Sequence, residues 1–162
     1  MSGEQQKLEN QLCFRLYTAS RLITQLYHPL LSKHGLTYPQ YLVLMVLWER
    51  DCQPVNDIAR RLMLETNTVT PLLKRMESEG VVSRSRGEAD ARQTIVSLTA
   101  RGRALKKKLC EVPEKVGSSV LCDKITPQTV PSLFEMLDEI IRHLGYLPNS
   151  RHAQPSRSVV PQ

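Results

Sequence analysis

Cysteine is the residue type in this 162-residue chain with the most distinctive reactivity, and it occurs as Cys13, Cys52, Cys110 and Cys122. No two cysteines form a Cys-x-x-Cys pair and no histidine lies at zinc-site spacing, so the sequence predicts neither a metal nor a cofactor. Structural disulfides are not expected in a reducing cytosol. The thiols are therefore expected to be free. A free thiolate is a nucleophile that peroxide oxidises to sulfenic acid, which can condense with another thiol.

A second chemically suggestive group is a run of short polar residues, namely Thr66, Asn67, Thr68 and Thr70. Side chains of this kind suit base edges, thymine methyl groups or phosphates. Thr66 or Asn67 is also a candidate helix N-cap. Capping accounts for one residue and not for four.

Positive charge is concentrated in the stretch that follows. The formal net charge is +6, and between Lys74 and Lys108 ten basic residues face four acidic ones. This segment alone therefore accounts for the net charge of the chain. Such a distribution is typical of nucleic-acid binding, with a merely solvated surface as the plainer alternative.

Hydrophobic periodicity predicts the elements that position these groups. Helices are expected over 8–32, from the capping pair Thr37 and Gln40 to about 49, over 55–63, from 66 or 67 to 79, over 99–108 and from 126 to 144. Gly35 is the expected stop of the first helix, and Thr99 is the expected cap of the helix over 99–108. The Gly-Ser-Ser sequence at 117–119 indicates a soft spot. Strands are expected over 81–86 and 93–98, joined by a polar turn.

This order of elements indicates a mainly α protein with a small β wing, the winged helix-turn-helix. Its second helix enters the major groove of DNA, and that helix also carries Lys74 and Arg75. Arg86 and Arg92 flank the wing turn, where arginine can enter a minor groove or contact phosphate, and Asp90 is placed to orient Arg92.

The sequence predicts one domain over 1–147, with the DNA-binding part at about 37–98 and a disordered tail over 148–162. The apolar first and last helices have no place in so small a module, so we expect a homodimer formed through the chain ends, bound to a palindromic operator in double-stranded DNA. No apolar run could span a bilayer and the N-terminus lacks a secretory signal, so no membrane partner and a cytoplasmic location are expected.

Three stretches carry a family resemblance: NQLCF at 10–14, LTYPQYL at 36–42 and TVTPLLKRM at 68–76. They resemble the organic hydroperoxide resistance regulators, a peroxide-sensing branch of the multiple antibiotic resistance regulator (MarR) family, and the similarity runs from about Leu8 to Leu144. Two stretches depart from the family pattern. Met63-Leu64-Glu65-Thr66 stands where Tyr-Leu-Asp-Ser is usual, and Ala91 stands where an acid is common.

The resemblance implies a transcriptional repressor, not an enzyme, that releases its operator when an organic hydroperoxide oxidises Cys13. It implies that Tyr27 and Tyr38 donate hydrogen bonds to the Cys13 thiolate, that Tyr17 lies nearby, and that Asp90 and Arg92 form the wing tip. Two-cysteine members of the branch place a resolving cysteine near the position of Cys122. Cys110 is the alternative resolving thiol, and Cys52 is expected to be passive.

Helix geometry constrains this assignment. Tyr17 follows Cys13 by one turn on the same helix face. Tyr27 follows Cys13 by fourteen residues, close to the same face but roughly 21 Å along a continuous helix. Contact between Cys13 and Tyr27 therefore requires a partner chain whose first helix runs antiparallel.

Three other functions remain open at this point. The chain could be a regulator of the same fold that responds to a small phenolic ligand, with incidental cysteines. It could be a thiol peroxidase, although a basic recognition helix and wing would have no use there. It could also be a constitutive architectural DNA-binding protein.

Overall fold

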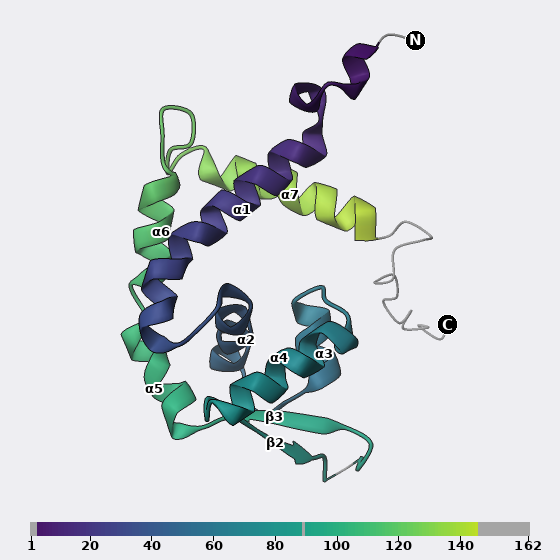
Figure 1. The fold of residues 1–162 in the computed structure, drawn as a ribbon, viewed down its shortest axis with the longest axis vertical. Coiled ribbons are helices and arrows are strands. Elements are labelled where there is room, and N and C mark those ends of the chain that lie inside the picture. The colour runs from purple at the N-terminus through teal and green to yellow at the C-terminus, as the bar shows by residue number, and fades with distance from the viewer. Residues whose placement is uncertain (1–2, 89, 146–162) are drawn as a thin grey trace, which may run out of the picture. The chain divides into compact units, whose positions relative to one another are not determined.

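The computed structural model describes residues 3–88 and 90–145, so the predicted tail over 148–162 lies outside it. The chain divides into two compact units, Met1–Val120 and Leu121–Gln162. In the first unit, helices α1 to α6 are accompanied by a small β-sheet (Figure 1). The prediction of a single domain over 1–147 stays a prediction.

Helix α1 (Leu12–Leu31) begins four residues later than its apolar pattern indicates. The short 3-10 helices η1 (Gly3–Gln6) and η2 (Leu8–Asn10) precede it, and the extended Gln11 forms its N-cap. At its other end, the 3-10 turn η3 (Ser32–His34) leads to Gly35 at φ 72°, a conformation that glycine adopts without steric cost. The predicted stop at Gly35 is therefore confirmed.

Helix α2 (Tyr38–Glu49) forms the centre of the core, because apolar residues lie on nearly all of its faces. The predicted capping box is present, and the Thr37 backbone N–H donates to Gln40 Oε1 at 2.8 Å. Val43, Leu44 and Leu47 are each at most 1 % exposed. Met45, in contrast, is exposed, so the helix is not buried all round.

Helices α3 (Val55–Arg61) and α4 (Thr66–Ser78) form the helix-turn-helix, and they pack on each other. The chain turns between them at Met63, whose φ is 54°. The N-cap of α4 is Glu65, without a side-chain hydrogen bond, so the prediction of a cap at Thr66 or Asn67 is wrong. Both residues lie in the first turn of the helix instead.

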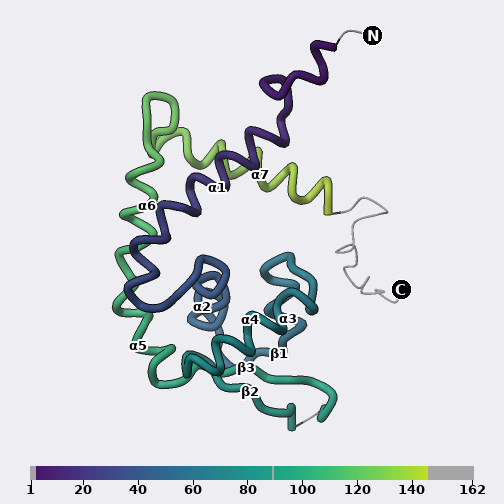
Figure 2. The backbone as a smooth tube through the Cα atoms, viewed as in Figure 1, coloured from purple at the N-terminus to yellow at the C-terminus, as the bar shows by residue number. Residues whose placement is uncertain are grey.

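The wing is part of a three-stranded antiparallel sheet formed by described residues, in the order β1-β3-β2 (Figure 2). Strands β2 (Val82–Arg86) and β3 (Thr94–Leu98) are the predicted hairpin, each one residue shorter than expected. Strand β1 (Gln53–Pro54) pairs with β3 and was not predicted from sequence, because it has two residues and one is a proline. Proline is tolerated there since β1 is an edge strand.

Helix α5 (Ala100–Lys108) starts at the predicted cap, where Thr99 Oγ1 accepts from the Gly102 N–H at 3.1 Å. A β-carbon on Gly102 would lie 2.3 Å from the Val81 carbonyl oxygen, so glycine is required for this close approach. Helix α6 (Val112–Val120) follows a short break and packs against α1. The predicted soft spot at 117–119 is wrong, since these residues are helical.

In the second unit, helix α7 (Val130–Gly145) begins four residues later than the predicted start at Thr126. Thr126 instead forms a turn with Thr129, whose Oγ1 accepts from the Thr126 N–H at 2.9 Å. Large apolar side chains of α7 are exposed, among them Phe134 and Ile141. Within 3–88 and 90–145, no helix has the length and apolar character needed to cross a membrane.

Candidate DNA interface and redox site

The first turn of α4 presents the predicted polar residues at the surface. Thr66, Asn67 and Thr68 are exposed and Thr70 is half-buried. The opposite face of the helix is anchored by the buried side chains of Val69, Leu73 and Met76. The apolar side chains anchor the helix to the core, and its polar N-terminal residues remain accessible to a ligand.

A small hollow of about 190 Å³ joins this helix to the wing. It is lined by Pro54, Val55, Asn56, Thr66, Thr70, Arg84, Arg92, Gln93 and Thr94. The structure thus brings Thr66, Thr70 and Arg92 together, as the winged helix-turn-helix requires. It adds Asn56 and Gln93, which sequence reasoning missed. Asn56 contacts the first turn of α4 directly, because its Oδ1 accepts a hydrogen bond from Thr66 Oγ1 at 3.1 Å.

The wing tip is held by hydrogen bonds that backbone N–H groups donate. Asp90 Oδ1 accepts from the Arg92 backbone N–H at 2.9 Å, and the Gly87 N–H donates to the Gln93 carbonyl at 2.9 Å. Asp90 therefore fixes the backbone at Arg92 and not its guanidinium. The side chains of Arg86 and Arg92 are exposed.

The basic segment between Lys74 and Lys108 divides into two groups. The first group is used inside the fold. Arg84 pairs with Glu77 at 2.8 Å, and this hydrogen-bonded ion pair lowers the pKa of the Glu77 carboxyl. Arg103 and Lys106 donate to the carbonyls of Leu98 and Trp48.

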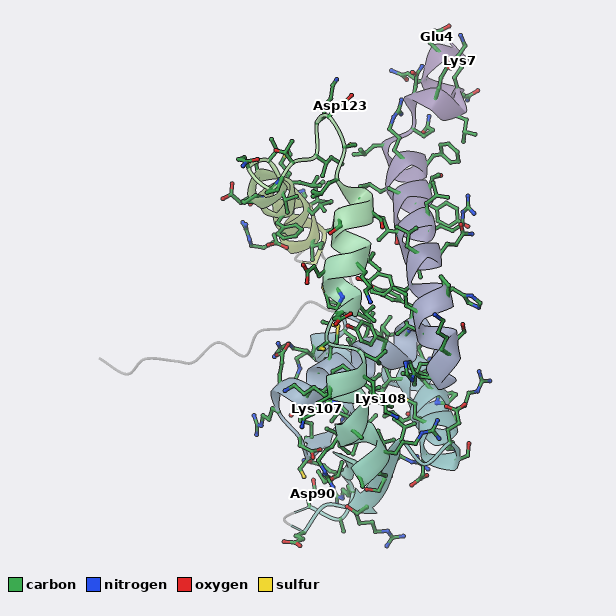
Figure 3. All side chains as sticks on the ribbon, turned by 90° about the vertical axis from the view of Figure 1, so that its left-hand side faces the viewer. Glu4, Lys7, Asp90, Lys107, Lys108 and Asp123 are labelled. Carbon is green, nitrogen blue, oxygen red and sulfur yellow. The ribbon has the colours of Figure 1, made fainter. Side chains whose placement is uncertain are left out.

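The second group is exposed and forms no ion pair among the residues that the structure describes; its members are Lys74, Arg75, Arg86, Arg92, Lys107 and Lys108. Figure 3 shows Lys107 and Lys108 on α5, apart from Asp90 at the wing tip. Only part of the positive excess is therefore available to the face formed by α4 and the wing.

Cys13 lies in the first turn of α1, and it is exposed. Its apolar neighbours Leu12, Phe14 and Leu16 are exposed as well, and Tyr17 is 66 % exposed. No side chain in the described part of the chain hydrogen-bonds to the Cys13 thiol. The cysteine therefore lies on an uncovered apolar surface.

Tyr27 and Tyr38 form a pair, with ring centroids 4.7 Å apart and planes inclined at 50°. Burial raises the pKa of both phenols, and the neighbouring Tyr38 adds to the rise at Tyr27. Both hydroxyls are therefore protonated at neutral pH and can donate hydrogen bonds. Because α1 is continuous from Cys13 to Tyr27, roughly 21 Å separates these two residues within one chain.

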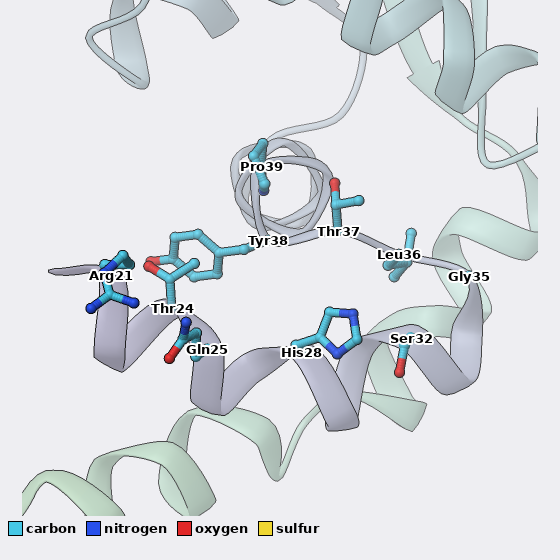
Figure 4. Close-up of a pocket in the computed structure, with 10 residues that line it drawn as sticks. All are labelled: Arg21, Thr24, Gln25, His28, Ser32, Gly35, Leu36, Thr37, Tyr38 and Pro39. Atoms are coloured by element: carbon cyan, nitrogen blue, oxygen red, sulfur yellow. The ribbon is translucent and has the colours of Figure 1, made fainter.

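A larger cavity of about 610 Å³ lies where α1 faces the start of α2. Tyr38 and Pro39 line it from α2, and Thr24 and His28 line it from α1 (Figure 4). Cys13 does not line this cavity. The structure thus brings Tyr27 and Tyr38 together but leaves Cys13 and Tyr17 elsewhere on α1.

The other three cysteines are also free and exposed. Cys52 has a φ of 57° and accepts a hydrogen bond from Ser97 Oγ at 3.3 Å. Cys110 lies between α5 and α6, and Cys122 lies after α6 in a turn closed by hydrogen bonds with Ile125. Among residues 3–88 and 90–145, no cluster of histidine, cysteine and acidic side chains could hold a metal ion.

Comparisons with known proteins identify the family. Residues 25–109, just over half of the chain, match the model of the transcriptional regulator SarA/Rot family. The chain is 43 % identical to the organic hydroperoxide resistance transcriptional regulator of Bacillus subtilis, over 83 % of this chain and 92 % of that protein. It is 36 % identical to the regulator MgrA of Staphylococcus aureus, over 86 % of this chain and 93 % of that protein.

Solved structures of AbfR, a protein of Staphylococcus epidermidis, are similar as well. Reduced AbfR bound to DNA is 43 % identical with a TM-score of 0.72, covering 89 % of this chain and 99 % of that one. Overoxidised AbfR bound to DNA is 43 % identical with a TM-score of 0.70, and the match covers 89 % of this chain and 98 % of that one. Disulfide-formed AbfR is 44 % identical with a TM-score of 0.62, and the match covers 87 % of this chain and 94 % of that one. The chain therefore belongs to the organic hydroperoxide resistance branch of the MarR family, and it is a winged helix-turn-helix transcriptional regulator, not an enzyme.

Proposed function

We propose that this regulator is a repressor that binds palindromic DNA as a homodimer and releases it when an organic hydroperoxide oxidises Cys13. The observation that carries the proposal is the position of Cys13: an exposed thiol on the exposed apolar surface of α1, in a chain that carries a DNA-reading module. A thiol at a subunit interface can link its oxidation to the geometry of two reading modules.

The DNA contact would be made by α4 and the wing. Thr66, Asn67, Thr68 and Thr70 would meet base edges in the major groove, with Lys74 and Arg75 on phosphates. Arg86 and Arg92 would reach the adjacent minor groove or backbone, and Asp90 would hold the tip in shape. The free cations and the shared hollow between α4 and the wing support this assignment.

The dimer would cover the apolar surface of α1. Leu22, Ile23 and Leu26 are 36 % to 50 % exposed, which is costly for apolar side chains in water. Two α1 helices that run antiparallel about a two-fold axis near Ser20 would place Cys13 of one chain opposite Tyr27 of the other. The protonated phenols of Tyr27 and Tyr38 could then donate hydrogen bonds to the Cys13 thiolate, with Tyr17 beside it.

The switch would begin with attack of the Cys13 thiolate on the distal oxygen of the hydroperoxide. The O–O bond breaks, an S–O bond forms, and the alcohol leaves after it takes up a proton. The thiol of Cys122 would then attack the sulfenic sulfur and displace water, which gives a disulfide. Cys110 is the alternative second thiol.

The disulfide is the state we expect to release DNA. AbfR has been solved on DNA both reduced and overoxidised, so a more oxidised AbfR still binds DNA. A disulfide-formed AbfR has also been solved. A cross-link between two elements restrains their geometry, whereas added oxygen atoms on one cysteine do not.

The test measures DNA affinity by fluorescence anisotropy before and after one equivalent of cumene hydroperoxide, with mass spectrometry of the products. The wild type should lose affinity and show Cys13 joined to Cys122. Cys13→Ser should keep its affinity, and Cys122→Ser should stop at sulfenic acid without the disulfide. Cys52→Ser is the matched control and should behave as wild type. Unchanged affinity of the oxidised wild type would refute the proposal, and a response that persists in Cys13→Ser would favour a ligand-responsive regulator.

A further inference from the structure

Gln40 is the one polar side chain that is fully buried among the described residues, with 1 % exposed. Its Oε1 accepts from the Thr37 backbone N–H at 2.8 Å, and its Nε2 donates to Glu79 Oε2 at 3.0 Å. Glu79 is the C-cap of α4. One buried amide therefore connects the start of α2 to the end of the recognition helix, across 39 positions of sequence.

Arg101 makes a second connection between the same two places. Its Nη1 donates to the Glu79 carbonyl at 2.5 Å, and its Nη2 lies 3.4 Å from the carbonyl of His34, just before α2. Glu79 is thus held through both its carboxylate and its carbonyl, each time to the segment 34–40. We call Gln40, Glu79 and Arg101 the coupling cluster.

The segment 34–40 also contains Tyr38, whose ring packs on Tyr27. A shift of Tyr38 therefore moves the residues that hold Glu79. The hydrogen bonds of the buried Gln40 amide resist stretching, because a donor or acceptor left unpaired in the core is costly, while the Arg101 bonds are exposed to solvent. Helix α4 is a rod of 13 residues, so a rotation at Glu79 is carried to Thr66 at its other end.

We infer that Gln40, Glu79 and Arg101 are positioning residues that couple the tyrosine pair to the recognition helix; the inference rests on the proposed function for the direction of the signal. The cluster makes no contact with the sulfur or with DNA in this assignment. It sets how much of a displacement at Tyr38 reaches Thr66. Since coupling is reciprocal, DNA bound at α4 should also order the segment 34–40.

The first test variant is Gln40→Met, which keeps the approximate shape of the side chain and removes its hydrogen bonds to Thr37 and to Glu79. Its matched control is Gln53→Met, because Gln53 Nε2 also donates to carbonyls of the α2 region but does not reach α4. The second variant is Arg101→Lys, which keeps the positive charge. Arg101 is exposed, so this change leaves the packing of the core intact. Arg103→Lys on the same helix is its control. Glu79→Gln keeps an acceptor for Gln40, so it should preserve the coupling.

The first measurement is hydrogen exchange of amides 34–41 with and without the DNA duplex that the protein selects from a random-sequence pool. DNA should slow exchange in the wild type, Gln53→Met, Arg103→Lys and Glu79→Gln, and this effect should be lost in Gln40→Met and Arg101→Lys. If DNA slows exchange equally in Gln40→Met, Arg101→Lys and the wild type, the inference is wrong. This readout uses reduced protein, so it does not depend on whether oxidation releases DNA.

The second measurement is the ratio of DNA dissociation constants for oxidised and reduced protein, with the rate of Cys13 oxidation. In Gln40→Met and Arg101→Lys the ratio should fall by about tenfold, the usual size of an allosteric coupling, with an unchanged oxidation rate. A merely structural role would lower Tm and leave the ratio intact, which contradicts the inference. A wild type without any oxidative release refutes the proposed function, and the hydrogen-exchange result still decides on the coupling cluster.

Discussion

The reading module, formed by α2, α3, α4 and the three strands, differs sharply from α1 in where its apolar side chains go. In the reading module Leu44, Ile58, Leu73 and Val96 are inaccessible to water. In α1, all of which the structure describes, Leu31 is the one buried residue. The module completes its core within one chain, whereas α1 leaves its apolar surface open.

The polar groups repeat this contrast. In the module, the buried Gln40 amide is hydrogen-bonded on both sides, and no buried polar side-chain atom in the described residues lacks a partner. On α1, Cys13 and Tyr17 are exposed. The contrast teaches that contacts within the chain fix the geometry of α4 and the wing, whereas they leave Cys13 exposed.

The largest effect should follow a cavity in the reading module. Leu73→Ala removes a fully buried side chain from α4 and should lower the free energy of unfolding by about 2–5 kcal/mol. Urea unfolding measures this loss. The control is Leu22→Ala on α1, where the side chain is 50 % exposed, and its cost should grow with protein concentration if a dimer buries it. If both variants lose the same free energy of unfolding, and neither loss depends on protein concentration, the contrast between the two regions is wrong.

The second effect should appear in assembly. Ile23→Glu places a carboxylate on the exposed surface of α1, and it should raise the dimer dissociation constant about a hundredfold, since burying an unpaired charge costs several kcal/mol. Sedimentation measures the dissociation constant. Gln25→Glu adds the same charge to the same helix at a polar position and should have little effect. If Ile23→Glu leaves the dimer dissociation constant unchanged, the exposed apolar surface of α1 does not form the dimer interface.

A third, smaller effect concerns DNA. Arg92→Ala removes a free cation from the hollow shared by α4 and the wing, and it should weaken binding by about tenfold, as expected for one arginine contact. Lys107→Ala removes an equally free cation from α5 and should change the affinity less. The comparison is made by anisotropy at one fixed salt concentration, because phosphate contacts depend on salt. Equal losses would mean that the interface extends onto α5.

The smallest effect should be the stabilisation from the Glu77–Arg84 ion pair, which is present near neutral pH and lost in acid. Arg84 lowers the pKa of Glu77 below its ordinary value of 4.5, so the pair stabilises the fold above that pH, and the contribution is lost as the pH falls through the lowered pKa. Unfolding of Glu77→Gln should therefore resemble the wild type more closely as the solution becomes acidic. The comparison variant is Glu111→Gln, which breaks the more exposed pair with Lys115 on α6 and should change stability less. A larger effect at Glu111 would contradict this ranking.

Local patterns were sufficient for much of the fold. The capping box of Thr37 and Gln40, the cap at Thr99 and the stop at Gly35 each depend on residues within one turn, and all three are confirmed. The cap of α4 was placed one or two residues late, because threonine and asparagine are better caps by type than the glutamate that occupies the position. Strand β1 was missed since its pairing partner is more than forty positions away.

By itself, the sequence determined the order of helices and strands, the polar first turn of α4, the basic excess and the family to which the chain belongs, because each depends on residue types at short spacing. Only the tertiary structure decided which cations are used inside the fold, as with Arg84 and Arg101, and which residues of the wing meet α4. It also decided that Tyr27 joins Tyr38 while Cys13 stays exposed. These relations connect residues far apart in the chain, and packing of the core, not local preference, sets such distances.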